Sequence, residues 1–216
     1  MIKEFLKYIR DLPKTVYFNY RCLPFEQAKK LPVRVKYDTK FGILDKNSIF
    51  INGKCERSMV KLGYRGGKFV SASHGYIGID KGKIIFNGTC NFGEGFGIAV
   101  EGGEISFGEN FYANRNFMAE CQKKITFGND VLLGWRVSVR DTDGHSINGK
   151  PFTEEITVQD HVWIASEVTI LKGSVISNNS VIACRSTVCG FKADKEKCLI
   201  GGTPAKVIKE GVEWTE

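Results

Sequence analysis

Branched aliphatic residues recur at every sixth position in the C-terminal half of the chain. The six positions that this period selects are Val158, Ile164, Ile170, Ile176, Ile182 and Val188. The fifth position of the first five hexads is small or β-branched, and is occupied by Val162, Val168, Ser174, Ser180 and Ser186. A period of six fits neither the 3.6-residue period of a helix nor the two-residue alternation of a β-sandwich.

The same period returns in shorter pieces upstream. Residues six apart are apolar in three further groups, which are Phe86, Phe92 and Ile98; Phe107, Ala113 and Ala119; and Phe127, Leu133 and Val139. This repetition predicts a triangular coil in which each hexad forms one short strand and one turn, and three hexads complete a coil. Position one of the hexad then points inward, and so does the small residue near the corner. We therefore predict an all-β solenoid of parallel strands.

The pattern resembles the left-handed parallel β-helix of the hexapeptide-repeat acyltransferases over about residues 67–209. Residues 110–116 (NFYANRN) also resemble an active-site segment of galactoside and maltose O-acetyltransferases, and GGTPAKVIK at 201–209 resembles the closing segment of the family. The chain resembles surface-polysaccharide O-acetyltransferases in the same way. It implies a left-handed parallel β-helix over 67–190, a short, partly helical N-terminal region over 1–66, and a C-terminal cap and coenzyme A-binding tail over 191–216.

The N-terminal region begins with an amphipathic segment. Four apolar side chains share one helical face of residues 1–11 and basic side chains lie elsewhere; the apolar ones are Ile2, Phe5, Leu6 and Ile9. This predicts a short basic helix that either lies on a membrane surface or packs on the protein or a neighbouring subunit. Residues 23–32 are typical of a further helix, and Val33–Tyr37 of a strand.

Composition narrows the class of protein. The 216 residues include 24 glycines and only 5 prolines, which suits many tight turns, and 42% hydrophobic content excludes disorder. The net charge of +7 favours an anionic partner. Aromatic residues do not alternate with the basic ones as they do in many nucleic-acid-binding surfaces, so we do not expect nucleic acid to be that partner. Seven scattered cysteines without a CxxC pair, and no sequence typical of a signal peptide or membrane span, predict a cytoplasmic protein with free thiols.

One long break interrupts the hexads between Val139 and Val158. It predicts an extruded loop over 140–157 that carries His145, with Asp141 and Asp143 just before it. Imidazole suits general base catalysis near neutral pH, and either carboxylate can hold it in one tautomer. The resemblance implies that His145 is the catalytic base, because the catalytic histidine of the family lies in such a loop.

The resemblance also implies residues that contact the acceptor. Asn114 falls at the position of a substrate-contacting asparagine, whose amide can donate to and accept from a sugar hydroxyl. The family often carries an aspartate eight residues later, but Gln122 stands there, and Glu120 is the nearby carboxylate that can replace it. Trp163 is expected outside the coil beside the loop, as an N–H donor or as a subunit contact.

Coenzyme A has its own set of residues by family position. Ser166, Cys184 and Cys189 are expected to line the channel for the pantetheine arm, and Lys206 and Lys209 to meet the phosphates. We expect no metal, because His145 and His161 lie in unlike contexts without the spacing of a zinc site. His161 and His74 are expected to be structural or exposed.

These features predict an enzyme that moves an acetyl group from acetyl-CoA to a hydroxyl of a sugar or surface glycan. Two alternatives remain open at this point. One is N-acetylation of an amino sugar or a xenobiotic, and the other is a non-enzymatic β-helix that binds a ligand or scaffolds a complex. The family commonly forms trimers with the cofactor between subunits, so the resemblance implies a homotrimer in which His145 of one subunit faces the coils of another.

Overall fold

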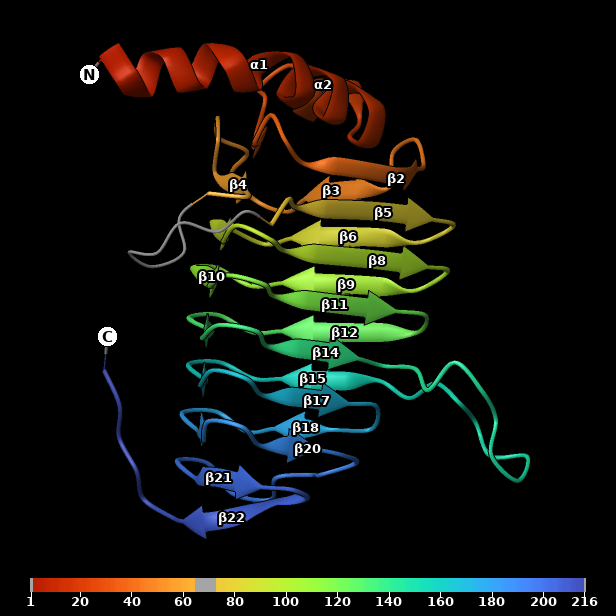
Figure 1. Cartoon of the computed structure of the whole chain (residues 1–216), viewed down its shortest axis with the longest axis vertical. Coiled ribbons are helices and arrows are strands. Elements are labelled where there is room, and N and C mark those ends of the chain that lie inside the picture. Colours follow the sequence, from red (N-terminus) through yellow and green to blue (C-terminus); the bar gives the residue numbers. More distant parts are fainter. Residues whose placement is uncertain (1, 65–72, 216) are drawn as a thin grey trace.

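The chain folds into a triangular solenoid of short strands (Figure 1). The computed structural model describes residues 2–64 and 73–215, with side chains from residue 6 onward. Within these residues, neighbouring strands pair in parallel, except for the antiparallel pair β21 and β22 at the C-terminal end. The predicted all-β solenoid, a left-handed parallel β-helix, is confirmed.

The described strands form three sheets, here called A, B and C, and the chain visits them in that order in each coil. Sheet A contains β1 (Val33–Val35), β4 (Val60–Leu62), β7 (Cys90–Phe92), β10 (Phe111–Ala113), β13 (Leu132–Leu133), β16 (Trp163–Ile164), β19 (Val181–Ile182), β21 (Leu199–Gly202) and β22 (Ala205–Lys209). Sheet B contains β2 (Lys40–Leu44), β5 (Tyr76–Asp80), β8 (Gly97–Glu101), β11 (Met118–Cys121), β14 (Ser138–Arg140), β17 (Thr169–Leu171) and β20 (Thr187–Val188). Sheet C contains β3 (Ile49–Ile51), β6 (Lys83–Phe86), β9 (Glu104–Phe107), β12 (Lys124–Phe127), β15 (Ile156–Val158) and β18 (Val175–Ile176).

The hexad positions form the interior, as the period predicts. All six aliphatics of the 158–188 series are fully buried, and the small residues at position five are at most 1% exposed. Upstream, larger side chains fill the same axis, and the rings of Phe86, Phe107 and Phe127 stack in successive coils at centroid distances of 5.5 and 5.4 Å. Each coil therefore buries its apolar positions against the next, which is how a solenoid builds its core.

The corners between sheets C and A use residues with left-handed backbone angles. Successive coils place Asn110, Asp130, His161, Asn179 and Lys197 there, with φ between 53° and 59°. Asn and Asp adopt this conformation more readily than other side chains do. The tight bend therefore does not need a glycine in every coil, which accounts for the glycine-poor hexads between 158 and 188.

The strand ladder begins well before the predicted boundary at residue 67. Strand β1 pairs in parallel with β4, and β4 with β7, so the first coils lie between residues 33 and 64. The predicted N-terminal region over 1–66 therefore contains solenoid. Its inward aliphatics do not keep a spacing of six because the corners between them vary in length, which hid the repeat. Residues 65–72, at the predicted boundary, lie outside the described residues.

Helix α1 (Ile2–Cys22) crosses the N-terminal end of the solenoid, and the short α2 (Phe25–Ala28) follows it (Figure 1). The helix predicted over residues 1–11 is confirmed and continues through Pro13 to Cys22. Of its expected apolar face, the side chains of residues 2–5 lie outside the described part, and Leu6 and Ile9 are exposed. In the part of the chain that the structure describes, no helix combines the length and apolarity needed to cross a membrane.

Side chains of α1 and α2 occupy the hydrogen-bonding positions of a missing coil. The amide of Asn19 accepts from the Val33 N–H at 3.1 Å and donates to the Val33 carbonyl at 2.6 Å. One turn earlier, the Thr15 hydroxyl does the same with Val35, accepting at 3.0 Å and donating at 3.3 Å. The Gln27 amide repeats the pattern with Ile51 on sheet C. The free edge of the first coil, which would otherwise invite pairing with another chain, is thus satisfied.

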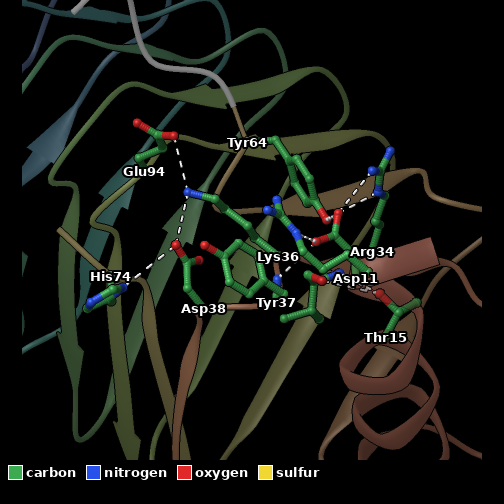
Figure 2. Close-up of polar contacts among 11 residues, drawn as sticks. Asp11, Thr15, Arg34, Lys36, Tyr37, Asp38, Tyr64, His74 and Glu94 are labelled. Atoms are coloured by element: carbon green, nitrogen blue, oxygen red, sulfur yellow. Dashed lines mark hydrogen bonds and ion pairs between the residues drawn. The ribbon is translucent and has the colours of Figure 1, made fainter. Parts of the chain in front are cut away.

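Asp11 lies one helical turn before Thr15 on the same side of α1, and it anchors a polar network (Figure 2). Its carboxylate accepts from the Tyr37 N–H at 3.1 Å, from the Arg34 guanidinium at 3.0 Å and from the Tyr64 hydroxyl at 2.6 Å. Burial, and then the hydrogen bond to Asp11, raise the pKa of the Tyr64 phenol above its usual range. Tyr64 therefore stays protonated and remains a donor to the carboxylate.

We expect Asp11→Ala to lower the free energy of unfolding by about 3–5 kcal/mol, because it leaves the partly buried Arg34 guanidinium without its carboxylate. Urea unfolding followed by circular dichroism measures this change. Glu26→Ala is the control, since Glu26 forms an exposed ion pair with Lys29, and it should change the unfolding free energy little. Equal effects of the two substitutions would contradict an anchoring role for Asp11.

Candidate functional site

The loop predicted to carry the catalytic histidine leaves the solenoid between β14 and β15, at the corner between sheets B and C. Figure 1 shows it projecting far from the strands. An antiparallel bridge between Thr142 and Thr153 closes its base, and Gly144 and Gly149 turn the chain with φ of 74° and 71°. His145 lies exposed on the outer part of this loop, so its ring can reach a molecule or subunit beside the solenoid.

Both aspartates near His145 are held by other groups. Asp141 is fully buried, and its carboxylate accepts from the backbone N–H groups of Gln122 and Lys123, each at 2.8 Å. Asp143 forms an ion pair with Lys172 at 2.7 Å. The His145 ring has no hydrogen-bond partner among the described residues, so the expectation that Asp141 or Asp143 holds its tautomer is not met within one chain. Asp141 instead fixes the base of the loop.

Asp141 also fixes its surroundings electrostatically. The Cys121 thiol donates to the Asp141 carboxylate at 3.2 Å. Burial, and then the charge of Asp141, raise the pKa of this thiol well above its usual range. Cys121 is therefore a protonated structural donor and not a nucleophile.

The residues considered for acceptor binding lie at two corners and on β11 between them. Asn114 follows β10 at the corner between sheets A and B, where its side-chain oxygen accepts from the Arg115 N–H at 2.9 Å. Gln122 lies at the loop base, accepting from the Thr142 hydroxyl at 3.0 Å. Glu120 is paired with Arg140 at 2.9 Å. The structure therefore does not bring Gln122 or Glu120 to Asn114 within one chain.

A groove runs along the corner between sheets A and B, C-terminal to Asn114. Its volume is about 420 Å³, and its lining consists of Gly134, Trp163, Ala165, Ser166, Val181, Ala183, Cys184 and Leu199. Three residues predicted from the sequence meet here, namely Trp163, Ser166 and Cys184. The Ser166 hydroxyl accepts from the Trp135 N–H at 3.1 Å and so joins two coils. The groove is mostly apolar, which suits the aliphatic part of an extended chain.

The remaining predicted cofactor residues do not line this groove. Lys209 pairs in register with Leu199 at its C-terminal end, and both Lys206 and Lys209 are exposed. Cys189 is different, because it follows β20 at the corner between sheets B and C, the corner that also carries the His145 loop. The structure does not bring Cys189 to the groove of its own chain.

The C-terminal tail adds a residue that sequence reasoning missed. Trp214 stacks on His161 at 4.2 Å, donates its indole N–H to the His161 carbonyl at 3.1 Å, and lies 6.1 Å from the Trp163 ring. This gives His161 a structural partner, while His74 is exposed near Asp38. In the sequence, Trp214 is a single tryptophan beyond the last hexad, so no period predicts where its side chain lies.

Sheet B carries a second feature that the hexad pattern does not show. A cavity of about 440 Å³ on its outer face is lined by Tyr76, Gly97, Ile98, Ala99, Met118, Ala119, Glu120, Ser138 and Arg140. Tyr76 and Met118 are 42% and 51% exposed, large values for apolar side chains on a sheet. Met118 lies so close over Gly97 that a Cβ there would be 2.7 Å from its sulfur. Within the described residues, no cluster of His, Cys, Asp and Glu could hold a metal ion.

No model of a protein family matches the chain, but individual proteins do. The chain is 36% identical to the galactoside O-acetyltransferase of Escherichia coli (strain K12) over 115 residues, which are 50% of this chain and 55% of that relative. It is 26% identical to the polysialic acid O-acetyltransferase of Escherichia coli O1:K1 over 124 residues, 54% of this chain and 40% of that one. The predicted resemblance is confirmed: the chain is similar in sequence to proteins named as sugar and glycan O-acetyltransferases.

The fold of these O-acetyltransferases matches as well. The solved structure of the polySia-specific acetyltransferase NeuO superimposes with a TM-score of 0.60 at 20% identity, covering 85% of this chain and 79% of that one. The chain spans little more than half the length of the galactoside O-acetyltransferase. The chain therefore shares the fold of this acetyltransferase and is similar in sequence to O-acetyltransferases over about half of its length.

Proposed function

We propose that the protein transfers an acetyl group from acetyl-CoA to a hydroxyl group of a sugar or surface glycan. The observation that carries this proposal is the groove at the corner between sheets A and B. It gathers Trp163, Ser166 and Cys184 in the coils that follow Asn114. The relatives named O-acetyltransferases support the same reaction class.

The groove fits acetyl-CoA as co-substrate. Its apolar lining suits the pantetheine arm, and the exposed Lys206 and Lys209 next to its C-terminal end suit the phosphates. The thioester then lies toward the N-terminal end of the groove, near Asn114. No metal is needed for this chemistry, because a thioester is already an activated acyl donor.

In the proposed reaction, His145 accepts the proton of the acceptor hydroxyl while the hydroxyl oxygen attacks the thioester carbonyl carbon. An N–H group near Trp163 or Asn114 stabilises the oxyanion of the tetrahedral intermediate. The carbon–sulfur bond then breaks, and the protonated His145 donates its proton to the leaving thiolate. The proton taken from the acceptor thus ends on coenzyme A, and the enzyme returns to its starting state.

This reaction requires two copies of the chain. His145 lies at the corner between sheets B and C, whereas Asn114 and the groove lie at the opposite side of sheet B. A closed threefold ring with sheet B toward its axis would set the loop of each subunit against the groove of the next. The exposed Tyr76 and Met118 on sheet B supply an apolar surface for such a contact. We therefore propose a homotrimer, in which Cys189 would approach the groove of a neighbour.

The cytoplasm is the proposed compartment. All seven cysteines are free thiols in the structure, including the exposed Cys184 and Cys189, which is typical of a reducing environment. A mass-spectrometric screen of sugars and oligosaccharides with acetyl-CoA tests the activity. An acetylated hydroxyl product supports the proposal, and acetylation of amines alone, or of nothing, refutes it.

Filling the groove should weaken cofactor binding. Cys184→Trp places a large side chain in the channel, so we expect the KM for acetyl-CoA to rise about tenfold or more while the KM for the acceptor changes little. Steady-state kinetics with each substrate varied in turn measures both constants. Thr157→Trp, on the outer face of sheet C, is the matched control and should leave both unchanged. An unchanged acetyl-CoA KM in Cys184→Trp would place the cofactor elsewhere.

A further inference from the structure

Helix α1 has a second apolar side that the described part of the chain covers only in part. Its side toward the solenoid consists of Asp11, Thr15, Phe18, Asn19 and Cys22, each at most 2% exposed. Four apolar residues lie on the opposite side, at spacings of three, seven and four residues that keep them on one helical face. They are Leu6, Ile9, Val16 and Tyr20, with exposed fractions between 37% and 58%. We call these four residues the outer stripe. Tyr17 and Phe25 lie beside it and are 56% and 66% exposed.

The outer stripe faces away from the solenoid along its long axis. The helix lies across the N-terminal end of the stacked coils, and its inner side is hydrogen-bonded to β1 (Figure 1). Subunits packed side by side through sheet B would therefore leave the stripe uncovered. An apolar helix face in this position marks an interaction surface.

The charge around the stripe identifies its partner. Between residues 6 and 30 the sequence has six Lys and Arg and two Asp and Glu. Asp11 is buried and paired with Arg34, and Lys29 is paired with Glu26. Lys14 and Arg21 donate to backbone carbonyls while keeping their positive charge at this end of the molecule. A second copy docked end to end would bring two such cationic ends together, which is unfavourable. An anionic lipid surface instead attracts the basic side chains and accepts the apolar ones. Tyr17 and Tyr20 suit that boundary, because each combines an apolar ring with a polar hydroxyl.

We propose that α1 attaches the protein to an anionic membrane surface, with its axis in the plane of the headgroups and the outer stripe at the acyl boundary. The solenoid then stands upright on the membrane, with its N-terminal end down. This attachment does not rest on the proposed acetyl transfer. Were both correct, the enzyme would be held close to acceptors built on lipid carriers.

Flotation of the full-length protein with lipid vesicles tests the attachment. The protein should float with phosphatidylcholine vesicles that contain phosphatidylglycerol, and much less with phosphatidylcholine alone or at about 0.5 M sodium chloride. The double substitution Ile9→Ser with Val16→Ser should weaken binding at least about tenfold. Ile208→Ser is the matched control: it is 61% exposed, lies between Lys206 and Lys209 and is at the opposite end of the solenoid. It should float like the wild type.

Three results would overturn the attachment. The first is a wild type that does not float with anionic vesicles, and the second is a double variant that floats undiminished. The third is an end-to-end dimer, seen by light scattering as a doubled mass that Ile9→Ser with Val16→Ser halves. Leu6→Ser, at a 58% exposed position, is the second variant in case the double one misfolds, and unchanged thermal unfolding confirms that each variant keeps its fold.

Discussion

Replacing His145 by alanine should lower the rate of acetyl transfer by about 10²- to 10⁴-fold, because the acceptor hydroxyl loses its general base. Binding of acetyl-CoA should stay as it is, since His145 lies on the exposed loop and the groove is built by the coils between sheets A and B. Steady-state rates with a responsive acceptor measure the first quantity, and isothermal titration with coenzyme A measures the second.

Two comparisons sharpen the result for His145. Ile147→Ala, two residues further along and 67% exposed, is the control for disturbance of the loop and should keep most of the activity. Asp143→Ala removes the ion pair with Lys172, and we expect a smaller loss than for His145→Ala, because no described contact joins Asp143 to the imidazole. Near wild-type transfer by His145→Ala would show that another group is the base.

Placing a charge on sheet B should separate the subunits and abolish activity together. Ala99 lines the cavity on the outer face of that sheet, so Ala99→Arg can extend into solvent in one chain but not into a packed neighbour. We expect light scattering to fall from about three times the chain mass of 24.1 kDa to that mass, with an unchanged circular dichroism spectrum. Thr157→Arg on sheet C should remain a trimer and active.

Mixed trimers give the sharper test of a shared site. His145→Ala and Asn114→Ala should each be inactive when pure. Unfolded together and refolded at equal amounts, they should recover up to about a quarter of the wild-type rate, because a quarter of the subunit contacts then pair an intact His145 with an intact Asn114. No recovery from correctly assembled mixtures would mean that both residues serve the site from the same chain.

The interior was the part of the fold that the sequence predicted best. The burial of a residue such as Ile170 follows directly from the sequence, because a strict period of six gives the equivalent residue of every coil the same inward orientation. The first coils were missed because Val33, Val35 and Leu44 stand at uneven spacing, although their strands pair in parallel with the later ones, with a register shift between Phe41 and Leu44. Their order comes from hydrogen bonds between distant segments, which no local window contains.

The candidate site, like the fold, was predicted from the sequence only in part. The break in the period located the loop of His145, and Ser166 and Cys184 both line the groove between sheets A and B, although their role in cofactor binding stays a prediction. The partners of Asp141 and Asp143 were not predictable, because Gln122 and Lys172 reach them only through the stacking of coils. Trp214 was beyond prediction for a related reason, since the tail that carries it folds back onto an earlier coil.

The side chains of α1 that complete β1 also set a limit on how long such an edge can be. Four residues of helix advance about 6.0 Å, whereas two residues of strand advance about 6.6 Å. Asn19, Thr15 and Asp11 keep pace with alternate residues from Val33 to Tyr37, but the two ladders drift apart by about 0.6 Å at each step. A fourth contact would lag by about 2 Å, beyond the tolerance of a hydrogen bond. The side chains of a helix can therefore satisfy the edge of a short strand, but not the edge of a long one. The short strands that the triangular coil requires are thus also what allows a helix to cap the solenoid.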